Sequence, residues 1–98
     1  MLFSWFNAKE ANRFGAELAQ IFIEKIPLGT PRTDKKFAIK TQRALDQIAL
    51  RTRQFQVSHT LNLYTRAKLA NNFKWTLKDA GYESTYVEEL TEWLVKRL

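Results

Sequence analysis

The 98-residue sequence contains no cysteine, one histidine, two prolines and three glycines. Without cysteine the chain can form neither a disulfide framework nor a thiolate metal site, and a reducing cytoplasm is the expected compartment. A metal site needs several converging ligands, so the single His59 is expected to be a packed or surface residue. We therefore expect no metal and no cofactor.

Residues arranged for catalysis are also lacking. The three glycines are scattered singly, which excludes a glycine-rich phosphate loop. Ser58 and His59 are neighbours in sequence, but neighbours on a helix point about 100° apart, so they are not evidence of a catalytic pair. The sequence predicts a protein that is not an enzyme.

Long apolar runs are missing as well, since none approaches the roughly 18 residues of a membrane span. The opening segment MLFSWF is apolar, but it has no cationic region before it and is soon followed by Lys9 and Glu10, unlike a signal peptide. We expect a soluble, non-integral protein in which this segment covers one end of the fold. Insertion into an anionic membrane surface is the less favoured alternative.

Carboxylates are scarce in the middle of the chain. Residues 32–78 contain eleven Lys and Arg against two Asp, a balance of +9, whereas residues 79–98 contain two cations against five carboxylates, a balance of −3. The overall net charge is +6. The middle of the chain is therefore the part suited to an anionic partner.

Apolar residues recur at spacings of three and four, which predicts helices. One example is the first stripe, Ala11, Phe14, Leu18, Phe22 and Ile26. We expect an all-α, compact four-helix bundle in a single domain, with helices at about 8–26, 34–56, 60–80 and 85–98.

Capping residues set the expected ends of these helices. Asn7 with Glu10 is predicted to begin the first helix, and Thr33 or Asp34 the second. Pro27 ends the first helix, and Gly81 is placed where a helix end requires positive φ. Thr85 with Glu88 is predicted to form the capping box of the last helix.

The helix-poor segment QVSHT, residues 56–60, is expected to separate the second and third helices. The apolar spacing nevertheless continues in phase across it, so a dimer built on one central helix over about 34–80 is the alternative. Polar residues Thr52, His59 and Arg66 interrupt the seam that such a coiled coil would need, which favours the broken helix.

Two surfaces are candidates for binding. The first is a cationic stripe on the second helix, opposite its apolar face: Lys36, Lys40, Arg43 and Arg51. The second alternates rings with cations along the third helix: Tyr64, Lys68, Trp75 and Lys78. In a compact bundle we expect Tyr64 and Trp75 to pack against the first or last helix with the lysine stems over the ring edges.

The C-terminal stretch NFKWTLKDAGYESTYVEELTEWLVKRL resembles the corresponding part of small uncharacterised helical proteins of bacteria, and this resemblance implies no activity. The expected function is a non-catalytic helical interaction module that acts through a protein partner or self-association. The alternative is nucleic-acid backbone binding through the cationic stripe of the second helix. A helix-turn-helix is disfavoured because the helix after Gly81 is acidic.

Overall fold

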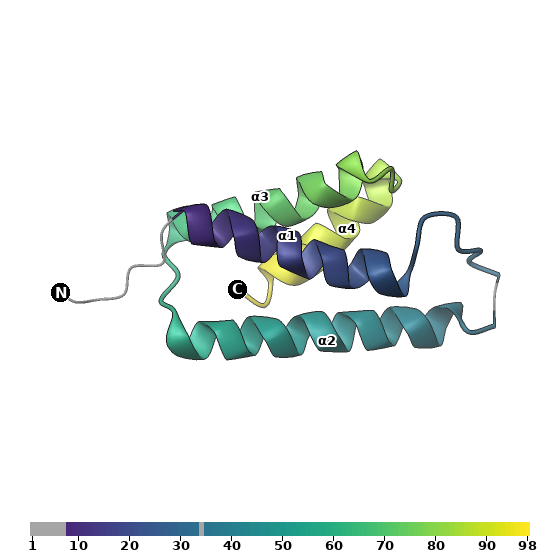
Figure 1. Ribbon diagram of the computed structural model, residues 1–98, viewed down its shortest axis with the longest axis horizontal. Helices are drawn as coiled ribbons and strands as arrows, with labels where there is room; N and C mark the ends of the chain where they lie inside the picture. The colour runs from purple at the N-terminus through teal and green to yellow at the C-terminus, as the bar shows by residue number, and fades with distance from the viewer. Residues whose placement is uncertain (1–7, 34) are drawn as a thin grey trace.

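The computed structural model describes residues 8–33 and 35–98, and these form an all-α fold of four helices (Figure 1). The helices are α1 (Ala8–Lys25), α2 (Phe37–Ser58), α3 (Leu63–Asp79) and α4 (Ser84–Val95). The predicted four-helix fold is confirmed. The proposed cap at Asn7, the segment MLFSWF and Asp34 lie outside the described residues.

α1 is the central helix of the packing (Figure 1). It lies beside α3, and the two run in the same direction, while α2 returns along the other side of α1 and α4 folds back against α3. The apolar stripe of α1 explains this position, because all five of its predicted core residues are buried between the neighbouring helices: Ala11, Phe14, Leu18, Phe22 and Ile26. They meet the buried Leu69, Phe73 and Leu77 of α3 and Val87, Leu90 and Leu94 of α4 in one core.

The end of α1 is connected to the α3–α4 turn by a buried tyrosine. The Tyr82 hydroxyl donates a hydrogen bond to the Ile26 carbonyl at 2.5 Å, and its ring meets the Phe22 ring edge-on at 5.8 Å between centroids. Gly81 has φ +102, as the sequence predicts for the residue that ends α3. This turn therefore fixes where α4 begins.

α2 is less deeply packed than the other helices. Only Ala44, Ile48 and Thr52 of its 22 residues are buried. Toward α4 its contacts are sparse: the Gln56 amide donates to the Arg97 carbonyl at 3.0 Å, while the buried Thr41 hydroxyl has no hydrogen-bond partner at normal distance. α2 is therefore held mainly by α1, and its outer side stays exposed.

The chain breaks between α2 and α3, so the long central helix over 34–80 is wrong. His59 is extended at φ −137 and ψ 134, and Asn62 is extended at φ −99 and ψ 177. The Asn62 side chain accepts a hydrogen bond from the Thr65 N–H at 2.8 Å, and the Thr65 hydroxyl accepts one from the Asn62 N–H at 3.0 Å. This capping box begins a new helix and compensates for the interrupted helical bonds.

Two predicted caps are also wrong. α2 begins at Phe37, later than the predicted start near Thr33 or Asp34, and Lys36 before it makes no side-chain cap. α4 is capped by Glu83, whose carboxylate accepts from the N–H groups of Thr85 and Tyr86 at 2.9 and 3.0 Å. Thr85 therefore lies inside the helix.

Candidate functional site

The outer side of α3 carries two exposed aromatic rings among lysines. We call Tyr64, Lys68, Lys74, Trp75 and Lys78 the aromatic–lysine face. Tyr64 is 61% exposed and Trp75 is 54% exposed, so the expectation that they pack against the first or last helix is wrong. The reason is that Thr65, Leu69, Phe73 and Leu77, spaced four apart, already supply the buried side of α3 and turn the two rings toward solvent.

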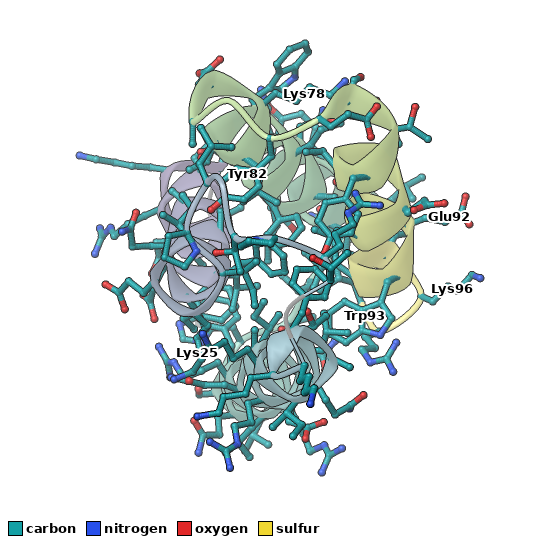
Figure 2. The ribbon with its side chains drawn as sticks, turned by 90° about the vertical axis from the view of Figure 1, so that its right-hand side faces the viewer. Lys25, Lys78, Tyr82, Glu92, Trp93 and Lys96 are labelled. Atoms are coloured by element: carbon teal, nitrogen blue, oxygen red, sulfur yellow. The ribbon has the colours of Figure 1, made fainter. Side chains whose placement is uncertain are left out.

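The lysine ammonium groups lie near these exposed rings, whereas the sequence predicts lysine stems over the edges of packed rings. The Lys68 ammonium is 5.5 Å from the Tyr64 ring centroid, while those of Lys78 and Lys74 are 5.1 and 5.6 Å from the Trp75 ring. These distances fall within the roughly 6 Å range of a cation–π contact. Figure 2 shows Lys78 at the outer side of α3, on the side away from α2. Sequence reasoning found this face but left Lys74 out of it.

The acidic α4 supplies one partner to this face. The Lys78 ammonium donates to the Glu88 carboxylate at 2.7 Å, and this hydrogen bond lowers the pKa of Glu88. Glu88 was predicted to reach back to the N-terminus of its own helix. It pairs across to α3 instead, because Glu83 already occupies the capping position.

A second feature is an apolar groove of about 350 Å³ between the first half of α3 and the end of α4. Its apolar lining comes from five residues: Leu63, Ala67, Ala70, Val95 and Leu98. Arg66, Asn71 and Thr91 complete it. Leu63 is 81% exposed and Val95 is 44% exposed. The sequence does not predict this groove, because the groove forms only where Ala67 and Ala70 of α3 lie opposite the end of α4.

The predicted cationic stripe of α2 is only partly an outer surface. Lys36 and Arg43 are exposed and Lys40 is half-buried. Arg51 instead turns toward α1, where its guanidinium pairs with the Glu17 carboxylate and lies 5.6 Å from the Phe14 ring centroid. Arg51 is therefore wrongly grouped with an outward-facing stripe, because α1 presents a carboxylate and a ring to it.

The sequence predicts that α2 has one cationic side and one apolar side. Its outer side carries apolar residues as well. Ile39 is 53% exposed, Leu50 is 52% exposed and Val57 is 85% exposed. A carboxylate, Asp46, is exposed there too and accepts a hydrogen bond from the Gln42 amide at 2.8 Å. Since α2 packs mainly on α1, only a narrow stripe of it is buried.

His59 packs in a column of rings at the junction of α1 and α2. Its ring is stacked 4.0 Å from that of Phe55, which in turn is stacked 4.0 Å from that of Phe14. His59 Nδ1 lies 3.2 Å from the Phe55 carbonyl oxygen and 3.3 Å from the Ser58 hydroxyl, and the tautomer of the imidazole sets which of these two contacts is a hydrogen bond.

Four of the described side chains have shifted pKa values. Burial raises the pKa values of Tyr82 and Tyr86, while hydrogen bonds lower the pKa values of Glu83 and Glu88.

Among residues 8–33 and 35–98, no group of three or more His, Asp or Glu side chains is placed to hold a metal ion. Nor does any described helix combine the length and apolar character needed to cross a membrane.

The chain was compared with protein families, with curated proteins and with solved structures. No family model, curated protein or solved structure matches it significantly.

Proposed function

We propose that the protein is a non-catalytic interaction module whose α3–α4 groove receives an amphipathic helix of a partner protein. The observation that supports the proposal is the exposure of Leu63 and Val95 around a floor of alanines. Small side chains let a partner helix approach closely, and an apolar groove is the usual receptor for the apolar side of such a helix.

The charge in the groove defines the partner further. Arg66 is the cation of the groove lining, whereas Lys96 lies 4.0 Å from Glu92 and Arg97 lies over the Trp93 ring. A matching helix would present apolar residues at positions i, i+3 or i+4, and i+7, with a carboxylate on the flank that meets Arg66. Binding would bury the Leu63 and Val95 side chains, which are exposed in the unbound chain.

Selection from a library of amphipathic helical peptides would test the groove. Bound peptides should shift the backbone amide resonances of α3 and α4, and Ala67→Glu should abolish binding, because Ala67 is exposed and its replacement places a charge in the groove without touching the core. Leu50→Glu is the control, since it places the same charge at an exposed position on α2. Resonance shifts confined to α1 or α2 would contradict the proposal.

A second copy of the chain is the other protein occupant to consider. Sedimentation equilibrium over a range of concentrations would detect it, and Ala67→Glu should then shift the population to monomer. A monomer at all concentrations, combined with peptide binding, would assign the groove to a different protein.

Nucleic-acid backbone binding through α2 is the second candidate function. It is favoured by the exposure of Lys36 and Arg43 beside Lys40. Arg51 is paired to Glu17. Phosphate contacts by Lys36, Lys40 and Arg43 would give a log–log salt slope of about −2.7 on duplex DNA. A salt titration of duplex binding tests this, with Lys36, Lys40 and Arg43 changed to Glu as the variant that should no longer bind.

A further inference from the structure

The aromatic–lysine face has a ligand chemistry different from that of the groove. Single exposed apolar residues are ordinary on protein surfaces. Here two large rings, more than half exposed, follow one line along the outer side of α3, and each has an ammonium group above it. Rings in such a position can be covered by another flat, apolar group.

The spacing suits a chain of such groups. Tyr64 and Trp75 are eleven residues apart, so they lie about 16 Å apart along the helix axis at 1.5 Å per residue. Lys68 lies between the two rings in sequence, while Lys74 and Lys78 flank Trp75. A ligand that covers both rings therefore runs along α3 past three ammonium groups.

Anionic charge must alternate with planar groups in that ligand. Lysine stems are flexible, so an ammonium that lies over a ring can turn to a phosphate once a base occupies the ring face. The Lys78 side chain is 21% exposed and its partner Glu88 is 52% exposed, so Lys78 reaches a phosphate only by exchanging this carboxylate for it. Bases stacked on rings with phosphates on neighbouring lysines are the recurring arrangement of single-strand binding.

From these observations we infer that the aromatic–lysine face of α3 binds single-stranded nucleic acid by stacking bases on Tyr64 and Trp75, with phosphates held by Lys68, Lys74 and Lys78. Duplex fits this face less well, because its bases are already stacked on one another. An acidic peptide would satisfy the lysines but would offer no planar group to the two rings. The inference concerns a different face from the groove, so the two can fail independently.

Fluorescence anisotropy with labelled oligo-dT and oligo-U provides the test. The wild type should bind them more tightly than a duplex of the same length, with a log–log salt slope of about −2 from roughly −0.7 per neutralised phosphate. Lys68→Gln should reduce the slope by about 0.7, whereas Lys25→Gln should not, because Lys25 lies at the end of α1, far from Lys78 (Figure 2).

The rings are tested by a pair of substitutions. Trp75→Ala should weaken binding by about 5-fold to 150-fold, the range expected for one lost stacking contact, while Trp75→Tyr should retain most of it. Both variants should melt close to the wild-type temperature, because Trp75 is exposed. A loss of binding without a loss of stability would separate this role from a structural one.

Four results would each overturn the inference. They are no oligonucleotide binding at low salt, duplex binding as tight as single-strand binding, unchanged binding by Trp75→Ala, and tighter binding of poly-glutamate than of the oligonucleotide. The last of these would assign the face to an acidic protein. Failure of the groove experiment would leave all four measurements unaffected.

Discussion

Gly15 lies where α1 meets the backbone of α3, and replacing it by alanine tests the packing of these two helices. A Cβ atom at this position would be 2.3 Å from the Leu69 carbonyl oxygen and 3.1 Å from the Phe73 nitrogen. Ordinary contact begins at 3.4 Å, so the helices would have to separate by about 1 Å. The nearest atom belongs to the backbone, so a change of side-chain rotamer cannot relieve the overlap.

Two opposing effects set the size of the change. Alanine is a better helix former than glycine by about 1 kcal/mol. Overpacking a well-filled core costs about 1 to 3 kcal/mol, and contact with a backbone atom places this case toward the upper end. We therefore expect Gly15→Ala to lower the free energy of unfolding by about 1 to 2 kcal/mol, and the Tm by about 4 to 16 °C for a domain of this size.

Urea unfolding followed by far-UV circular dichroism would measure this change. Ala67→Gly on the exposed side of α3 is the control, because it changes helix propensity alone by about 0.5 to 1 kcal/mol. If Gly15→Ala stabilised the protein by the amount that Ala67→Gly destabilises it, propensity alone would explain both variants. The close approach of α1 and α3 would then be refuted.

Three further predictions follow from the same structure. Phe73→Ala should destabilise the protein by about 3 to 5 kcal/mol because Phe73 is fully buried. Trp75→Ala should change the free energy of unfolding by no more than about 0.5 kcal/mol, because Trp75 is exposed. Equal losses of the two variants in urea unfolding would contradict the exposure of Trp75. Gly81→Ala should lower stability by about 1 to 3 kcal/mol in thermal melts because of its positive φ, and an unchanged melt would place that turn differently. Backbone N–H donors lower the pKa of Glu83 below 4.5, so its contribution to stability is present above pH 4.5 and lost as pH falls through the lower folded value. Glu83→Gln should therefore flatten the acid dependence of the Tm, and an unchanged profile would argue against the cap.

The helical architecture could be predicted because it depends on local spacing. The stripe from Ala11 to Ile26 is buried along its whole length, and Gly81 ends α3 with the expected positive φ. The interruption near His59 was also predicted from weak helix formers. Each of these features follows from neighbours within one or two turns of the chain.

Caps were predicted less well, because several polar residues compete for each helix end. Glu83 caps α4 in place of Thr85, since the buried Tyr82 and the glycine turn before it place Glu83 at the first free N–H groups. Asn62 caps α3, which begins at Leu63, three residues later than the predicted start at about residue 60. Spacing alone does not show which of two nearby side chains reaches the helix end.

By itself, the sequence determined that this is a helical protein with four apolar stripes, a cationic middle and an acidic last helix. Only the tertiary structure decided that Tyr64 and Trp75 face solvent, that Arg51 pairs with Glu17 of α1, and that Leu63 and Val95 border a groove. The physical reason is that periodicity specifies which residues share a side of a helix, but not which side is covered. Coverage depends on the neighbouring helices, and α2, held mainly by α1, leaves surfaces exposed that a fully packed bundle would bury.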